Sequence, residues 1–283
     1  MRLTGALLGV CLATGGGAWG FDIERTETEQ KTLRFKAGAP REFELDVVNG
    51  SIRVTGADIN EVRLTAKIKW EAWSEEKLAE AKKAITIHTQ EDEKGIYVTV
   101  DTPWKCGEGC YNQPGYRRTG YKFRHDFEVQ VPRDVAVKLK AVNGEGVKLT
   151  GTRAKFHVDS VNGGVELDDV TTGGWAHTLN GNLIVRFSRN PTENSYLKSF
   201  NGKVEAYFQP GLNANAQLKT FNGSVTTDFE GTSLANPLAA GERKDGRWRY
   251  RSNDWRGFRI GSGGPELKLE SFNGNIHILN RTK

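Results

Sequence analysis

The sequence predicts an all-β protein, a β-solenoid-like stack of repeated units with one short helix in its N-terminal part. Three observations support this. An Asn-Gly dipeptide with an apolar residue before it recurs seven times, most copies lie about twenty residues apart, and apolar and polar residues alternate on both sides of it. The seven asparagines are Asn49, Asn143, Asn162, Asn180, Asn201, Asn222 and Asn273. A fixed period with the same residues in the same phase is typical of stacked repeats.

Each unit reads as strand, Asn-Gly corner, strand and looser corner. From Asn143 to Asn222 the successive asparagines are 19, 18, 21 and 21 residues apart. An apolar residue follows the Gly by two positions in six units, and in the Asn143 unit it comes one place later, at Val147. Alternation with period two indicates strands rather than helices. Asn-Gly is expected to reverse the chain because both residues tolerate positive φ.

Two architectures fit these units. In a β-solenoid, like residues stack on like, and the Asn side chains can form a hydrogen-bonded ladder along one corner. In an antiparallel meander or sandwich, each Asn-Gly is a hairpin tip and no ladder is needed. The sequence favours the solenoid, because a meander requires only some turn-forming residue at each tip.

The Asn-Gly repeats and two further segments resemble the bacterial putative-adhesin family of DUF4097 type. The segments are Phe127–Arg133, with the sequence FEVQVPR, and Gly263–Ile276, with the sequence GGPELKLESFNGNI. The resemblance covers roughly Phe43 to the C-terminus. It implies an exported, non-enzymatic protein with a β-solenoid-like fold, and it supplies no catalytic residues.

The N-terminus has the pattern of a secretory signal peptide. Arg2 is followed by an apolar run from Leu3 to Leu12 and then by small residues up to Gly20, which predicts cleavage before Phe21. No later segment resembles a transmembrane span. We therefore expect a signal peptide at 1–20 and a mature chain in the periplasm, outside the cell or on the cell surface.

The mature chain is divided into an N-terminal β-rich part, residues 21–134, and an Asn-Gly repeat array, residues 135–283, with a Trp/Arg-rich insertion at 232–262. The alternative is that residues 21–283 form one continuous domain. In the first part, Ser74 followed by two glutamates predicts a capped helix whose residues Leu78, Ala81 and Ile85 share one side.

Cys106 and Cys110 are expected to form one disulfide, because two cysteines in an exported chain most simply pair. A metal site that adds His125 is the alternative, but structural zinc needs four ligands. The sequence therefore indicates no metal and no cofactor.

Arg247–Arg251 alternates arginines with Trp248 and Tyr250, and it reads as one arm of a hairpin whose other arm carries Phe258 and Ile260. Aromatic faces and guanidinium groups together can hold sugars and anions. The other interpretation is a covering hairpin whose aromatic side chains belong to the core. The candidate ligand-binding residues are Arg247, Trp248, Arg249, Tyr250, Arg251 and Trp255, with Tyr116, Arg117 and Arg118 as a second set.

The net charge of +5 allows attraction to anionic glycans, and no basic cluster is dense enough to suggest nucleic acid. Four acids of the array, Asp159, Glu166, Asp168 and Asp169, could serve a polysaccharide-degrading enzyme. Outward strand positions and turns are, however, where acids normally lie. His157 and His177, twenty residues apart, could stack on adjacent units as a solvated pair.

The sequence thus predicts an exported, non-catalytic β-solenoid scaffold that binds a surface glycan, another envelope component or an envelope protein. The alternative is a β-helical polysaccharide lyase or hydrolase. The ligand and the oligomeric state are left open.

Overall fold

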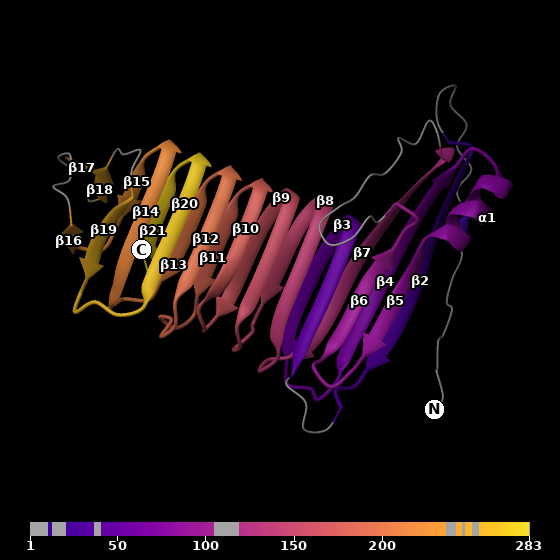
Figure 1. Ribbon diagram of the computed structural model, residues 1–283, viewed down its shortest axis with the longest axis horizontal. Helices are drawn as coiled ribbons and strands as arrows, with labels where there is room; N and C mark the ends of the chain where they lie inside the picture. The colour runs from indigo at the N-terminus through magenta and orange to yellow at the C-terminus, as the bar shows by residue number, and fades with distance from the viewer. Residues whose placement is uncertain are drawn as a thin grey trace.

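The protein is all-β, and its sheet is not closed (Figure 1). This computed structural model describes residues 11–12, 21–36, 41–104, 119–235, 242–244, 247–250 and 255–282. The elements of the N-terminal half are β1 (Cys11–Leu12), β2 (Ile23–Leu33), β3 (Glu42–Ala57), β4 (Val62–Ala72), α1 (Glu75–Ala84), β5 (Thr86–Glu91), β6 (Ile96–Asp101), β7 (Tyr121–Pro132), β8 (Ala136–Thr150) and β9 (Phe156–Val170). The remaining elements are β10 (Gly174–Asn180), β11 (Leu183–Phe187), β12 (Ser195–Asn201), β13 (Val204–Phe208), β14 (Ala214–Asn222), β15 (Val225–Thr227), β16 (Gly231–Ala235), β17 (Glu242–Lys244), β18 (Arg247–Tyr250), β19 (Arg256–Ile260), β20 (Glu266–Asn273) and β21 (Ile276–Asn280).

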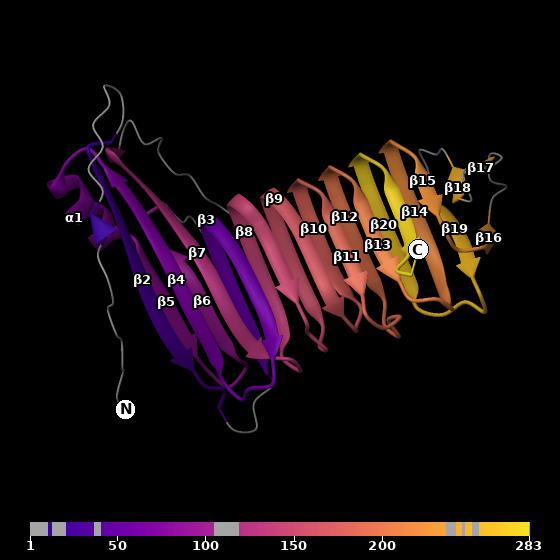
Figure 2. The ribbon, with the colours of Figure 1, turned by 180° about the vertical axis from the view of Figure 1, so that it is seen from behind.

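The strands form two layers, seen from either side in Figures 1 and 2. Strands β3, β8 and β9 are long enough to pass through the Asn-Gly corner, so each contributes its first half to one layer and its second half to the other. In later units the two halves are separate strands. In the first layer β9 is followed by β10, β12, β20 and β14, and in the second layer by β11, β13, β21 and β15, all parallel.

The N-terminal end of the stack is antiparallel in both layers. In the first layer β6 pairs in parallel with the first half of β3, and β5 pairs antiparallel with β6. Strand β7 pairs in parallel with the second half of β3, and β4 and β2 then extend the second layer in antiparallel fashion. Helix α1 begins after Ser74, whose side chain accepts a hydrogen bond from the backbone N–H of Lys77, and it buries Leu78 and Ala81. The capped helix predicted from the sequence is therefore confirmed. In the described part of the chain, no helix is both long enough and apolar enough to cross a membrane.

The seven asparagine side chains form one column along the corner. Every asparagine except Asn49, the first of the column, donates its amide Nδ2 to the Oδ1 of the next asparagine toward the N-terminal end of the stack, at distances between 2.7 and 3.2 Å. The order along the column is Asn49, Asn143, Asn162, Asn180, Asn201, Asn273 and Asn222. Such a ladder requires parallel units in register, as in other stacked amide arrays.

Glycine follows each asparagine because the backbones of neighbouring units approach closely at this position. The asparagines themselves do not adopt the left-handed conformation. Among the described residues, Asp169 is the one non-glycine residue with positive φ, so the expected positive φ at the asparagines is wrong. A Cβ on Gly202 would overlap the carbonyl of Gly181, and one on Gly274 would overlap that of Gly202. Only a residue without a side chain permits this stacking distance.

A column of buried hydroxyl groups lies two residues before the asparagines. The hydroxyls of Thr178, Ser199, Ser271 and Thr220 each donate to a corner glycine carbonyl of the neighbouring unit, at 2.8 to 2.9 Å. These side chains are buried, and buried carbonyl groups need hydrogen-bond partners. These buried hydroxyl groups therefore connect the corners of neighbouring units by hydrogen bonds on the core side.

The core lies between the two layers and repeats from unit to unit. Inward positions carry aliphatic side chains that are fully or almost fully buried, and Phe187 and Phe208 stack with their ring centroids 5.0 Å apart. In the first layer these positions are Leu139, Val158, Ala176, Leu197, Leu269 and Leu218. In the second layer they are Val147, Val165, Leu183, Val204, Ile276 and Val225.

The C-terminal strands depart from the sequence prediction in pairing. The expected hairpin between 247–251 and 256–260 is wrong, because its two arms join different layers. Strand β18 pairs with β15 and β17, whereas β19 pairs with β14 and β16. Each arm continues the layer it reaches and lies at the C-terminal end of the stack (Figure 1).

His125 is a buried titratable group within the N-terminal part. Its ring lies between Trp70, Phe123 and Phe127, with centroid distances of 5.7 to 6.4 Å. Burial disfavours the charged imidazolium and lowers the pKa of His125 to about 4, although the charge of Asp126 acts in the opposite direction. The folded protein therefore holds this histidine neutral at ordinary pH.

We predict that Asn180→Ala lowers the free energy of unfolding by about 1–2 kcal/mol, because it removes two hydrogen bonds from the middle of the column. Chemical denaturation of the two purified proteins measures the difference. Asn60→Ala, in an exposed loop, is the control and should change stability by less than about 0.5 kcal/mol. Equal effects of the two substitutions would contradict a stabilising ladder.

His125 should make the fold sensitive to mild acid. A histidine whose pKa is lowered in the folded state stabilises the fold fully above its unfolded pKa near 6.5, and this contribution is lost as the pH falls toward 4. We predict a loss of roughly 2–4 kcal/mol over that window, and a much smaller loss in His125→Phe. His88→Gln, at an exposed position, is the control. Parallel pH profiles of all three proteins would refute the prediction.

Candidate functional site

A row of large side chains crosses the outer surface of the first layer. In the strand register, His157 of β9 lies beside Trp175 of β10, Trp175 beside Tyr196 of β12, and Tyr196 beside Lys268 of β20. The centroids of Trp175 and His157 are 5.8 Å apart and those of Trp175 and Tyr196 are 4.2 Å apart. Lys268 Nζ then lies 4.4 Å from the ring of Trp255. We call His157, Trp175, Tyr196, Lys268 and Trp255 the aromatic strip.

The strip follows from strand alternation and from the unequal lengths of the units. Period-two alternation turns His157 and Asp159 outward while Val158 is buried. Because Asn162 and Asn180 are 18 residues apart, the neighbour of His157 is Trp175 and that of His177 is Asp159. The expected stacking of His157 on His177 is therefore wrong by two residues, because Trp175 takes the place expected for His177. The strip could not be predicted from the sequence for the same reason.

Asp159 connects both histidines below the strip. Its Oδ2 lies 2.8 Å from His157 Nε2, and its Oδ1 lies 3.4 Å from His177 Nδ1. The indole Nε1 of Trp175 also donates to Oδ1, at 3.4 Å. Burial alone would raise the pKa of Asp159, but the hydrogen bonds from His177 and His157 outweigh it and hold the pKa below its ordinary value. The carboxylate thus fixes three side chains of the site.

At the other end of the site, the carboxylate of Glu270 lies among lysine side chains. Tyr196 donates its hydroxyl to Glu270 Oε2 at 2.9 Å, and Lys198 pairs with the same oxygen at 3.3 Å. Burial, followed by the hydrogen bond to Glu270, raises the pKa of the Tyr196 phenol, which stays protonated. Lys219 Nζ lies 5.7 Å from Trp255, so it approaches the same indole as Lys268. This end therefore presents cations beside an exposed indole.

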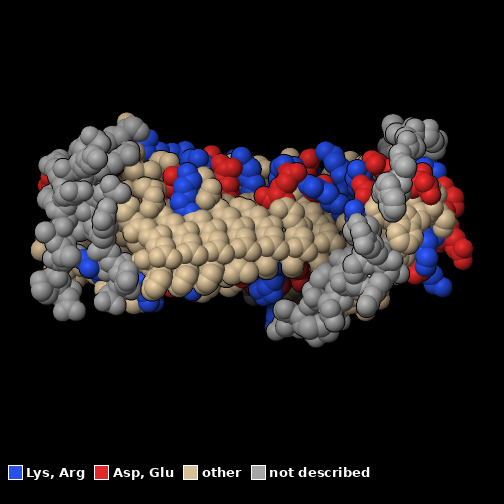
Figure 3. Space-filling model, turned by 90° about the horizontal axis from the view of Figure 1, so that it is seen from above, with Lys and Arg blue, Asp and Glu red and all other residues tan. Residues whose placement is uncertain are grey.

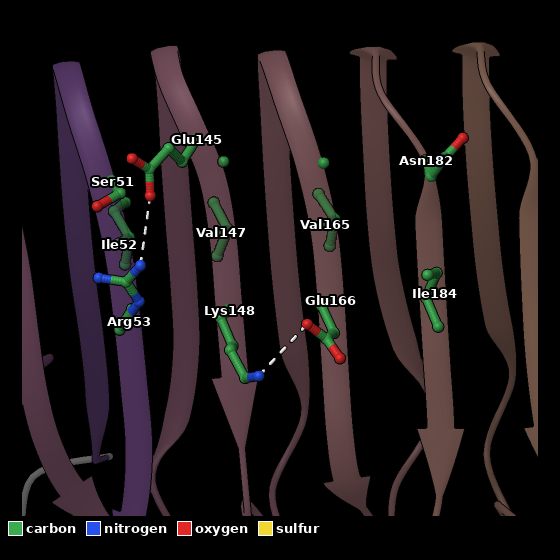
Figure 4. Close-up of a pocket in the computed structure, with 12 residues that line it drawn as sticks. Ser51, Ile52, Arg53, Glu145, Val147, Lys148, Val165, Glu166, Asn182 and Ile184 are labelled. Atoms are coloured by element: carbon green, nitrogen blue, oxygen red, sulfur yellow. Dashed lines mark hydrogen bonds and ion pairs between the residues drawn. The ribbon is translucent and has the colours of Figure 1, made fainter.

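A shallow pocket lies in the second layer, close to the corner (Figure 4). It has a volume of about 280 Å³. The pocket arises where Gly146 and Gly164 lack side chains and where the Asn143 unit carries one extra residue, which shifts the register. Arg53 pairs with Glu145 and Lys148 with Glu166, each at 3.3 Å. The charged side chains that line the pocket therefore already form ion pairs with one another.

The four acids considered for catalysis are divided between the two layers. Asp159 precedes the corner of β9, whereas Glu166 and Asp168 follow it. Arg186, at 2.7 Å, and then Lys148 lower the pKa of Glu166 against the effect of burial. Asp168 pairs with Arg281 at 3.5 Å. Within the described residues, no group of three or more His, Cys, Asp or Glu side chains is placed to hold a metal ion.

Most of the ligand-binding residues predicted from the sequence cannot be placed as side chains. Cys106, Cys110, Tyr116, Arg117, Arg118 and Arg251 lie outside the described residues, as does most of the predicted signal peptide. Arg247–Tyr250 is described as the backbone of β18. Trp255 is 38% exposed and joins the aromatic strip. The disulfide therefore stays a prediction.

The corner itself presents an uncharged edge. Leu179, Phe200, Phe272 and Phe221 precede the asparagines and are 37–49% exposed. Phe272 stacks between Phe200 and Phe221 at 4.7 and 4.8 Å. Figure 3, which views the molecule from above, shows an uncharged band bordered by charged side chains. The faces of the phenylalanine rings contact one another, so the ring edges are the part that faces solvent.

No family model matches the chain, and no curated protein sequence matches it. The resemblance to the DUF4097-type family therefore stays a prediction. Three solved structures are similar to the chain at low identity. A putative cell adhesion protein from Clostridium sporogenes is 11% identical, with a TM-score of 0.45, and the match covers 90% of this chain and 100% of that one.

The other two structures come from Parabacteroides. A putative lipid binding protein from Parabacteroides distasonis is 8% identical, with a TM-score of 0.29. A putative adhesin from Parabacteroides merdae is 9% identical, with a TM-score of 0.25. Both matches cover 89% of this chain and 96% of the other. With TM-scores below 0.5, these likenesses carry no inference about the function of this chain.

Asp159 gives the site a testable pH dependence. Its pKa is lowered in the folded state, so its contribution to stability is present above the unfolded pKa near 4 and is lost as the pH falls through the folded pKa. We predict that Asp159→Asn destabilises the protein at pH 6, by roughly 1 kcal/mol or less because the group is partly exposed. The gap between the two proteins should narrow as the pH falls below the unfolded pKa. A gap of constant size in denaturation experiments would contradict this assignment.

Proposed function

We propose that the protein is an exported, non-catalytic scaffold that binds an anionic polysaccharide of the cell envelope along the aromatic strip. The observation that carries the proposal is the alignment of His157, Trp175, Tyr196 and Lys268 on four adjacent strands. Adjacent strands lie about 4.8 Å apart, so the strip, including Trp255, is about 20 Å long. A site of this length suits an extended polymer better than a small molecule.

The chemistry of the strip supports a glycan. Asp159 and Glu270 offer carboxylate oxygens that can accept hydrogen bonds from sugar hydroxyls. Trp175 and Trp255 are 37% and 38% exposed and provide apolar contact area. Lys268 and Lys219 beside Trp255 would attract an acidic sugar to one end.

The scaffold proposal rests on how the stack is built. The units are parallel and share one corner column, and this arrangement supports a β-solenoid-type architecture over a meander. The corner and core positions maintain the stack, so the outward positions are free to carry a ligand. Export rests on the pattern of the first twenty residues.

We predict that Trp175→Ala and Lys268→Ala each weaken the binding of a soluble polyuronate about tenfold or more, as measured by calorimetry, in line with the loss of about 1.4 kcal/mol. Lys268→Ala should have a smaller effect on a neutral glucan. Trp73→Ala, which removes an exposed tryptophan near α1, is the matched control.

Equal binding by the three variants and the wild type would remove the strip as the site. Turnover of the polyuronate by the wild type, lost in Asp168→Ala, would replace the scaffold by an enzyme.

A further inference from the structure

The last Asn-Gly unit of the chain does not lie last in the stack. Strand β20 pairs in parallel with β12 on one side and with β14 on the other. Strand β21 is likewise placed between β13 and β15. The two units that flank it follow each other directly in the sequence, so residues 266–280 occupy a slot opened between consecutive units. Figure 1 shows yellow β20 between the orange strands β12 and β14.

The stack depends on residues 266–280 to fill this slot. Leu267, Leu269, Ile276 and Ile278 of the inserted unit are fully buried. Its Asn273 donates to Asn201 and accepts from Asn222, at 2.7 Å in both cases. An empty slot would interrupt the column and expose the edges of β12 and β14 in one layer and of β13 and β15 in the other. The unpaired N–H and C=O groups of such edges readily pair with another chain.

Kinds of contact that recur between other units of the stack hold the inserted unit. They are backbone pairing in register, the asparagine amide, the hydroxyl of Ser271 on the Gly202 carbonyl, and stacking of Phe272. Side chains of the neighbouring strand β12 also contact this unit specifically, since Tyr196 and Lys198 both approach Glu270. The slot therefore fits residues 266–280. It has no contact that distinguishes the unit of its own chain from that of another copy.

A short glycine-rich segment carries the chain into the slot. Strand β19 ends at Ile260 on one side of β14, and β20 begins at Glu266 on the other side. The five residues between them have the sequence Gly-Ser-Gly-Gly-Pro. Gly261 and Gly263 adopt φ values of 57° and 79°, which favour glycine.

The segment is held mainly by two asparagines. Asn213 Oδ1 accepts from the backbone N–H and the hydroxyl of Ser262, and Asn215 Nδ2 donates to the Gly264 carbonyl. Extended, five residues reach about 17 Å. The segment thus has the properties of a hinge.

We propose that the slot between β12–β13 and β14–β15 also accepts residues 266–280 of a second copy, so that two molecules exchange their C-terminal units. The exchanged pair keeps every contact of the monomer and changes only the hinge, which is the basis of domain swapping. Lys268 and Glu270 lie on β20, so in the exchanged pair each aromatic strip is completed by the partner copy. Two joined strips would bind one polymer with increased avidity.

The exchange can be tested in the full mature chain with one introduced cysteine per molecule, after Cys106 and Cys110 are both replaced by serine. Lys198 and Glu270 are register neighbours on β12 and β20, and their charged groups are 3.3 Å apart. Lys198→Cys and Glu270→Cys chains are unfolded, mixed, refolded together and oxidised. We expect a covalent dimer that joins one chain of each kind. Refolding the variants separately before mixing should yield about tenfold less of it.

Three controls make the outcome decisive. The Lys198→Cys/Glu270→Cys double variant, refolded dilute, should close a disulfide within one chain and so report correct folding. Glu270→Cys mixed with Lys148→Cys, whose lysine lies in the second layer, should give no dimer above background. Deleting Gly263 and Gly264 shortens the hinge and should raise the dimer fraction, because short hinge loops favour exchange.

If the double variant closes its disulfide but the mixed single variants stay monomeric, the exchange proposal is overturned. Equal dimer yields with Lys148→Cys would overturn it too, because they indicate random collision. Either result would leave the polysaccharide site of the monomer intact, so the two proposals can fail separately.

Discussion

The close parallel stacking of the Asn-Gly corners is the constraint on which the rest of the structure depends. At each corner the missing side chain of a glycine lets the carbonyl of the next unit approach, and a Cβ there would overlap it. This distance brings the amide of one asparagine within reach of the next. Inside the stack, the glycine carbonyl and the asparagine amide of a corner are hydrogen-bonded to neighbouring units, so the hydrogen bonds of a corner depend on the units beside it.

The corner also fixes the register of both layers. A shift of one residue would turn every inward side chain outward, since alternation in a strand has period two. The asparagine column permits one register only, so Ala176 and Leu197 of adjacent units meet in the core. The Asn143 unit shows how an extra residue is tolerated. Its insertion is absorbed as a register shift at the corner, and the pocket of Figure 4 lies there.

Much of the fold could be predicted from the sequence because it depends on local repetition. The spacing of the asparagines indicated stacked units, and Ser74 with the acids after it indicated the helix. The order of the units could not be predicted. Asn222 and Asn273 have the same neighbours, Phe before and Gly after, so the pattern does not tell which one lies beside Asn201. That order depends on where the chain goes after β19, and the described strands β16 to β19 carry no Asn-Gly repeat.

The candidate site was not predictable for a different reason. Its members are outward residues, and the repeat constrains inward and corner residues only. Whether His157 meets Trp175 or His177 depends on a difference of two residues in unit length. The site can therefore change while the fold is maintained, because substitutions at outward positions leave the corner contacts intact. A scaffold of this type separates the residues that maintain the stack from those that can bind a ligand, and the aromatic strip belongs to the second group.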